Sequence, residues 1–191
     1  MDDQPLPFHD SFDELLDAFR VAIASVTWLK LSAKEARGFY ADKNEIIGLT
    51  CSVTEKTIKV GKDILLSIEK EAFEQPGLYN QAMINFYRVF TIAIKDVVWE
   101  TADFSQHLSK PEFKFLKHIR NASAHNNQFY WGNAAQRVST LNELPVVWKN
   151  KKINQELEGA KLYMHFLQPG DLFYLLADIS RLAVTHSHQS Q

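Results

Sequence analysis

Four segments of this chain repeat apolar side chains with the period of an α-helix. Apolar residues recur at steps of three and four from about Asp10 to Leu31, from Tyr79 to Ala102 and from Asp171 to about Thr185. The fourth segment runs from Ser109 to His125 and opens on Ser109 and Glu112, which fit a capping box. Such spacing places the apolar residues of each segment on one helix face, so the pattern predicts four long amphipathic helices.

Two further segments have mixed patterns. Val53 to Phe73 fits a helix only in part, because Gly61 interrupts it and Thr57 to Val60 alternate like a strand; a helix is the favoured interpretation. Pro145 to Ile153 is typical of two short strands around a polar turn, and Lys161 to Phe166 is a candidate third strand. A small β region is therefore expected within a helical chain.

The expected fold class is all-α. We expect an up-and-down helical bundle with a small β-hairpin insertion, at about residues 145–166, after the helix of Ser109 to His125. The length of 191 residues suits a single domain over 1–191, which ends in a polar tail at 186–191.

Cysteine content and the absence of long apolar runs indicate the cellular context. Cys51 is the only cysteine, so no disulfide can form within the chain and the cytosol is the default compartment. The first residues lack the basic start and apolar run of a signal peptide, and no run of about 18 apolar residues offers a membrane helix. We therefore expect a soluble, cytoplasmic protein with no membrane partner.

The net charge excludes a broadly cationic surface. Twenty-one Lys and Arg stand against twenty-three Asp and Glu, which gives a formal charge of −2. A site for nucleic acid must therefore be local. The middle of the chain has such a local excess, because Lys110, Lys114, Lys117 and Arg120 outnumber the acidic residue Glu112 among them.

Side chains suited to phosphodiester cleavage gather on the polar side of the same helix. On a helical wheel, the arc opposite the apolar face carries Lys114, Lys117, His118, Asn121 and His125. Arg120 lies at its shoulder, roughly 140° around the helix from His125. A guanidinium holds phosphate oxygens, an imidazole transfers protons and an amide orients either group. The predicted catalytic residues are Arg120, Asn121 and His125, and the predicted RNA-binding residues are Lys114, Lys117 and His118.

No carboxylate cluster accompanies these residues in the sequence, so we predict no metal site and no cofactor. A reaction without a metal-bound water can use the 2′-hydroxyl of RNA as its nucleophile, which DNA lacks. The residues therefore indicate a metal-independent cleavage of RNA.

The motif Arg120-Asn121-Ala122-Ser123-Ala124-His125 resembles the signature of the HEPN superfamily of small helical domains, which is Arg, usually a polar residue, three more residues and His. Arg120, Asn121 and His125 match it residue by residue. The resemblance implies a homodimer formed through the motif helices, with two Arg/His sets in one cleft. It also implies a metal-independent endoribonuclease of a toxin-antitoxin, abortive-infection or related defence system, whose partner is an antitoxin or a defence protein.

One position departs from part of that family. In the HEPN toxins paired with nucleotidyltransferase antitoxins, a modified Tyr stands two residues after the motif His, whereas this chain has Asn127 there. Tyr130 is close in sequence but off register. Regulation by adenylylation is therefore not predicted.

The motif also has a second interpretation. Arg120 could pair with a carboxylate and His125 could cap a carbonyl on a solvated helix face. A separate alternative function is a catalytically inactive HEPN-like module that binds RNA, a nucleotide or a protein partner through the same cleft.

Two groups outside the motif are open to similar alternatives. Phe129, Tyr130 and Trp131 could stack on bases, although aromatics after a helix more often pack in the core or in a dimer seam. Phe113 and Phe129 are candidates for that seam. The hairpin lysines could contact RNA or a partner, or form a solvated tip: Lys149, Lys151 and Lys152.

Overall fold

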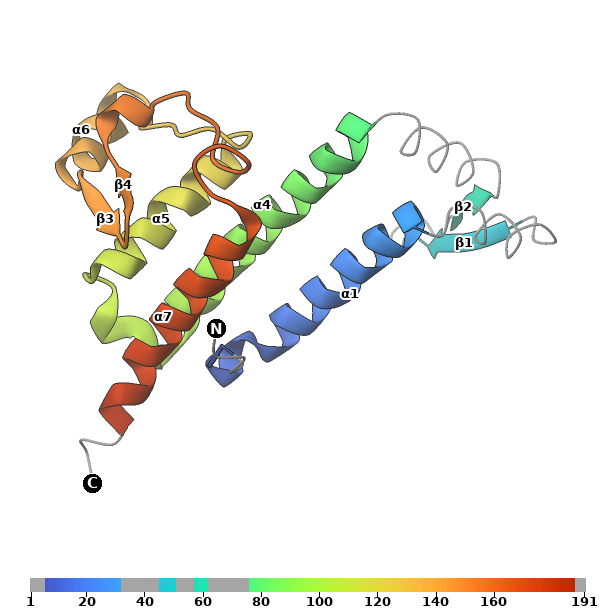
Figure 1. The fold of residues 1–191 in the computed structure, drawn as a ribbon, viewed down its shortest axis with the longest axis horizontal. Helices are drawn as coiled ribbons and strands as arrows, with labels where there is room; N and C mark the ends of the chain where they lie inside the picture. Colours follow the sequence, from blue (N-terminus) through green and yellow to red (C-terminus); the bar gives the residue numbers. More distant parts are fainter. Residues whose placement is uncertain (1–5, 32–44, 51–56, 62–75, 188–191) are drawn as a thin grey trace. The chain divides into compact units, whose positions relative to one another are not determined.

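The computed structural model describes residues 6–31, 45–50, 57–61 and 76–187, and these are mostly helical (Figure 1). They contain five α-helices: α1 (Asp13–Leu31), α4 (Pro76–Glu100), α5 (Pro111–Ala124), α6 (Ala134–Asn142) and α7 (Pro169–Ser187). They also contain three short 3-10 helices: Asp10–Phe12, Ala102–His107 and Gln155–Leu157. The strands form two antiparallel pairs: β1 (Glu45–Thr50) with β2 (Thr57–Gly61), and β3 (Val146–Trp148) with β4 (Lys151–Ile153). None of the described helices is long and apolar enough to cross a membrane.

Backbone contacts divide the chain into two compact units. One unit comprises Met1–Phe19 and Ile84–Gln191, and the other comprises Arg20–Met83. Helices α1 and α4 each continue from one unit into the other. Helix α5, which carries the predicted catalytic residues, belongs to the first unit.

Helix α5 forms part of the core of the first unit. Its residues Phe113, Phe115, Leu116 and Ile119 are fully buried, and the helix packs against α7 and β3. Buried apolar residues of the other helical segments complete this core: Phe12, Leu16, Phe19, Phe90, Ile94, Val98, Leu172, Leu175, Leu176 and Ile179. Burial of each such side chain contributes about 1.5–3 kcal/mol. The four helices predicted from apolar periodicity are confirmed.

Helix α5 begins differently from the prediction. Its N-cap is Lys110, with φ −69° and ψ 153° and no side-chain hydrogen bond, so the predicted capping box of Ser109 and Glu112 is wrong. Pro111 occupies the first helical position, where its missing N–H is not needed. Because proline favours extended backbone in the residue before it, Lys110 becomes the cap instead of Ser109.

The second unit contains a β-hairpin where the sequence favoured a helix. Strands β1 and β2 pair in a register that places Thr50 opposite Thr57. The helix predicted over Val53 to Phe73 is therefore wrong for 57–61, and the rest of that segment lies outside the described residues. The alternation at 57–60 suits a pleated strand once a partner is present, and the partner at 45–50 had no clear pattern of its own.

The region after α5 contains the predicted hairpin insertion and a helix that was not predicted. Strands β3 and β4 pair with Val146 opposite Ile153, which confirms the hairpin. The third strand predicted at 161–166 is wrong, because these residues form only isolated bridges. Helix α6 has no buried residue, so its sequence lacks the apolar stripe by which a helix is recognised.

The hairpin is attached to α7 by polar contacts. Lys149 Nζ lies 2.9 Å from Asp178, and Lys151 Nζ lies 3.2 Å from Asp171. Trp148 Nε1 also donates to Asp178, at 3.0 Å. Lys149 and Lys151 are therefore ion-paired within the chain; Lys149 is still exposed at the tip of the hairpin, whereas Lys151 is only partly exposed.

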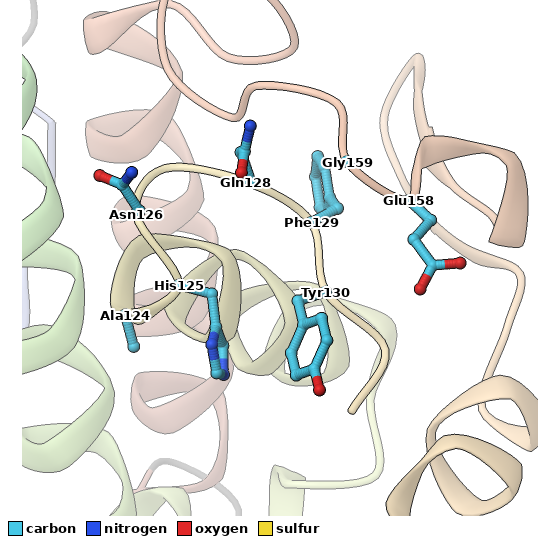
Figure 2. A pocket seen from close by; sticks show the side chains of 8 residues that line it. All are labelled: Ala124, His125, Asn126, Gln128, Phe129, Tyr130, Glu158 and Gly159. Atoms are coloured by element: carbon cyan, nitrogen blue, oxygen red, sulfur yellow. The ribbon is translucent and has the colours of Figure 1, made fainter. Parts of the chain in front are cut away.

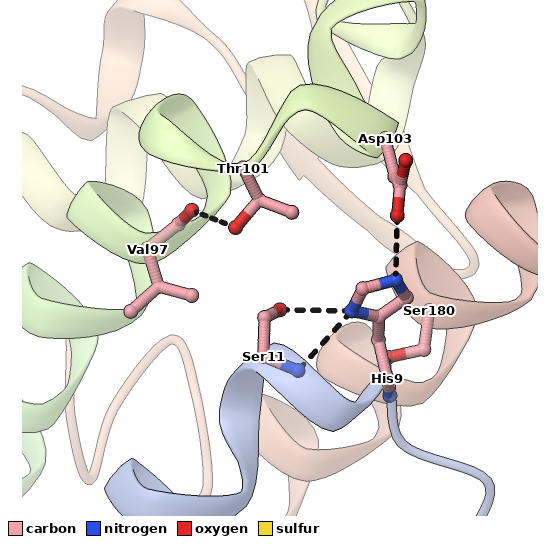
Figure 3. Close-up of polar contacts among 6 residues, drawn as sticks. All are labelled: His9, Ser11, Val97, Thr101, Asp103 and Ser180. Carbon is pink, nitrogen blue, oxygen red and sulfur yellow. Dashed lines mark hydrogen bonds and ion pairs between the residues drawn. The ribbon is translucent and has the colours of Figure 1, made fainter.

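His9 anchors the first described residues (Figure 3). Its backbone N–H donates to Ser180 Oγ of α7 at 3.0 Å. The His9 side chain caps the 3-10 helix that follows, because its Nδ1 accepts from the backbone N–H of Ser11 at 3.3 Å; Nδ1 also lies 2.9 Å from Ser11 Oγ. Because Nδ1 accepts, Nε2 carries the proton and faces Asp103 at 3.3 Å.

Candidate functional site

The motif helix α5 ends at the predicted catalytic histidine. His125 is the C-cap, and its backbone N–H donates to the carbonyl of Asn121 at 3.0 Å. Asn126 and Asn127 follow with φ of 54° and 61°, left-handed values that Asn tolerates at the end of a helix. The chain therefore turns directly after His125, and the His125 side chain remains exposed.

His125 lines an open pocket with a volume of about 470 Å³ (Figure 2). The lining residues are Ala124, His125, Asn126, Gln128, Phe129, Tyr130, Glu158 and Gly159. The rings of His125 and Tyr130 point to the same side of the loop that joins them, with centroids 4.6 Å apart. Among the described residues, the imidazole has no hydrogen-bond or ion-pair partner. Within that part of the chain its nitrogens are available for proton transfer.

The carboxylate at the edge of this pocket is already paired. Both oxygens of Glu158 accept from the Arg137 guanidinium at 2.5 Å. This bidentate bond holds the pKa of Glu158 below its ordinary value. Glu158 is therefore a poor proton acceptor, and His125 is the better candidate for proton transfer in this pocket.

Arg120 lines a different pocket, with a volume of about 290 Å³, formed by residues of α4 and α5. The other lining residues are Lys95, Trp99, Lys117 and Asn121. The Nε of Arg120 is buried without a hydrogen-bond partner. Among the arginines of the described residues, Arg120 alone has neither a hydrogen bond nor an ion pair.

The motif residues of a single chain are therefore divided between two pockets. Arg120 and Asn121 line the pocket of α4 and α5, whereas His125 lines the other pocket. The separation follows from helix geometry, because five residues advance by roughly 140° beyond a full turn. In these two pockets of the described residues, Arg120 and Asn121 therefore lie together and His125 lies apart from them.

The predicted RNA-binding residues differ in exposure. Lys114 and Lys117 are partly exposed on α5, and Lys117 Nζ lies 2.6 Å from Glu143. His118 is only 1% exposed, so the prediction that it lies on an open polar face is wrong. Trp131 meets the His118 ring edge-on at 6.0 Å between centroids, and Glu143 lies 3.6 Å from its Nε2. These side chains cover the face that the helical wheel left open.

The burial of His118 should make the stability of the fold depend on pH. Desolvation lowers the pKa of His118 below its ordinary 6.5; Glu143 opposes this and Lys117 adds to it. Because the unfolded chain binds the proton more tightly, this histidine destabilises the fold increasingly as the pH falls below about 6.5. Between about pH 7 and pH 5, the free energy of unfolding should fall more steeply for the wild type than for His118→Leu. Denaturant unfolding across that range measures both slopes, and equal slopes would contradict the expectation.

The aromatic residues after the motif divide between core and surface. Phe129 and Trp131 are buried, as expected for packing, whereas Tyr130 is 41% exposed beside His125. Phe113 and Phe129 are buried within their own chain. The prediction that these two residues form a dimer seam is therefore wrong.

Asn127, two residues after His125, has a structural role. Its Oδ1 accepts from the backbone N–H of Tyr163 at 2.9 Å, and its carbonyl accepts from that of Leu162 at 2.9 Å. It is 6% exposed and has a positive φ. This position fixes the 162–163 segment to the end of α5.

Helix α4 supplies three residues that sequence reasoning did not single out. Lys95 and Trp99 line the Arg120 pocket, with Lys95 Nζ 5.1 Å from the centroid of the Trp99 ring. Arg88 Nε donates to the carbonyl of Ser123 at 2.7 Å, which places a cation at the C-terminal end of α5. The sequence could have indicated that Lys95 and Trp99 lie together, because residues four apart share one helix face.

Comparison of the chain with protein-family models, with curated proteins and with solved structures found no match. Among the described residues, no group of three or more His, Cys, Asp or Glu side chains is arranged to hold a metal ion.

Proposed function

We propose that this protein is a metal-independent endoribonuclease that cleaves RNA by attack of the substrate's own 2′-hydroxyl. The observation that carries the proposal is that two motif side chains have no hydrogen-bond or ion-pair partner among the described residues. Within the described residues, Arg120 pairs with no carboxylate and the His125 ring caps no carbonyl. Those two contacts are the ones expected of a merely solvated helix face. A cation and an imidazole that lack such contacts on one helix favour a role toward a ligand.

Each motif residue has a role in this reaction. His125 takes the proton from the 2′-hydroxyl or gives one to the leaving 5′-oxygen. Arg120 neutralises the charge that builds on the phosphorane, and Asn121 orients the reacting groups. The resemblance to the HEPN superfamily supports these roles, and it implies a toxin-antitoxin, abortive-infection or related defence system as the setting.

The separation of Arg120 from His125 favours a homodimer in which the motif helices face one cleft. In such a cleft, Arg120 of one protomer acts with His125 of its partner on the same phosphate. Arg120→Ala and His125→Ala homodimers should both be nearly inactive, the first through loss of about 3 kcal/mol of transition-state stabilisation. Co-refolding the two variants should restore activity to about a quarter of the wild type, since half of the dimers then contain one complete site.

Solution mass and cleavage rates of the mixed sample test this arrangement. A monomeric mass, or a mixture as inactive as its components, would exclude a site shared between protomers. Recovery must depend on mixing during refolding, so separately refolded variants combined afterwards serve as the control.

The alternative is a catalytically inactive module that binds RNA, a nucleotide or a protein partner through the same residues. The observation that favours it is the placement of Arg120 and His125 in different pockets of one chain. Such a module would bind RNA and would yield no cleavage products.

A further inference from the structure

The pocket of α4 and α5 has an unusual combination of side chains for its size. Three cationic residues, an indole and an amide line about 290 Å³: Lys95, Lys117, Arg120, Trp99 and Asn121. We infer that this pocket binds one nucleotide, with the phosphate on the cations and the base against Trp99. The assignment of that nucleotide to an RNA strand rests on the proposed function.

The three cations of the pocket differ in their acidic neighbours. Lys95 Nζ lies 3.4 Å from Asp96, and Lys117 Nζ lies 2.6 Å from Glu143. Arg120 has no such partner among the described residues, and its buried Nε lacks an acceptor. Buried donors are rarely left unsatisfied, and a guanidinium matches two phosphate oxygens. A bound phosphate supplies the missing acceptor.

Trp99 adds a surface for a base. It is partly exposed, and Lys95 Nζ lies 5.1 Å from its ring. Sites for single-stranded nucleic acid combine aromatic rings, on which bases stack, with cations that follow the backbone. The volume is at the low end for small-molecule pockets, which fits one nucleotide and not a duplex.

The pocket also places this nucleotide beside the cut. In the proposed dimer, Arg120 of this pocket acts on the scissile phosphate together with His125 of the other protomer. Arg120 belongs to both the catalytic set and this pocket, whereas Lys95 and Trp99 belong to the pocket alone. Substitutions of Lys95 and Trp99 therefore test nucleotide binding separately from catalysis.

The first experiment measures binding of a fluorescent 2′-O-methyl oligonucleotide, which cannot be cleaved, by anisotropy. Trp99→Leu and Lys95→Ala should each weaken binding by about tenfold, while Trp99→Phe retains most of the affinity. Glu143→Gln should strengthen binding several-fold, because it releases Lys117 toward the phosphate. Matched controls are Lys161→Ala, an exposed lysine, and Tyr174→Leu, an exposed aromatic, which should leave binding unchanged.

The pattern of results separates this inference from the proposed function. Unchanged affinity in Trp99→Leu and Lys95→Ala, both folded by circular dichroism, overturns the nucleotide pocket even where RNA is cleaved. Weakened binding in these variants, in a wild type that cleaves no RNA, supports the pocket and overturns the nuclease. A loss of affinity in Glu143→Gln overturns the role assigned to Lys117.

A second set of ligands identifies the source of the nucleotide. The probes are inorganic phosphate, adenosine 5′-monophosphate and the oligonucleotide. Tighter binding of the oligonucleotide, weakened by salt, supports a strand. Equal affinity for the mononucleotide, still lost in Trp99→Leu, retains the pocket but overturns the RNA assignment.

Discussion

Replacing His125 with alanine should slow RNA cleavage by at least about a hundredfold and leave the fold unchanged. The imidazole transfers the proton in the proposed reaction, and Glu158, the carboxylate of the same pocket, is held by Arg137. Because His125 is exposed and its ring has no hydrogen-bond or ion-pair partner among the described residues, its removal leaves no buried group unsatisfied. Single-turnover cleavage of a labelled RNA and thermal unfolding by circular dichroism measure the two effects.

A second histidine provides the matched control. His165 is also exposed but does not line the His125 pocket, so His165→Ala should cleave at the wild-type rate. Addition of EDTA should also leave the rate unchanged, since the nucleophile comes from the RNA itself. Cleavage that survives His125→Ala, or that requires magnesium, would refute the proposed mechanism.

A single 2′-deoxy or 2′-methoxy nucleotide at the cut site should abolish cleavage of that bond. The proposed nucleophile is the hydroxyl on the sugar next to the scissile phosphate, and both substitutions remove it. The upstream product of unmodified RNA should end in a 2′,3′-cyclic phosphate and the downstream product should begin with a 5′-hydroxyl. Mass spectrometry of both fragments identifies these ends.

The same substrates contain their own control. A modified nucleotide one position away leaves the attacking hydroxyl in place, so that substrate should still be cut. Unpaired loops should be cut in preference to duplexes, because in-line attack requires a splayed backbone that a stacked A-form helix resists. Continued cleavage at the modified position would require a different nucleophile.

Local sequence patterns were sufficient to predict much of the fold. The apolar faces of α1, α4, α5 and α7 and the β3–β4 hairpin follow from the spacing of residues close in sequence. Helix α6 could not be predicted in this way, because it buries no side chain. The β1–β2 pairing was missed because a strand is recognised with its partner, and that partner was ambiguous on its own.

The candidate site, like the fold, could be predicted from the sequence only in part. The sequence identified the Arg120 to His125 motif, but the helical wheel could not show which part of the polar arc would be covered. His118 is buried because Trp131 and Glu143 lie against it, and both come from segments beyond the helix. Lys95 joins the Arg120 pocket only because α4 lies beside α5.

The sequence by itself therefore determined the helical class, the hairpin after the motif helix and the motif, because each depends on residues that are neighbours along the chain. Only the tertiary structure decided that Arg120 lies with Trp99 while His125 lies with Tyr130. It also decided which cations are ion-paired and which remain open to a ligand. The physical reason is that burial and pairing depend on which distant segment packs against each face, and periodicity carries no information about that choice.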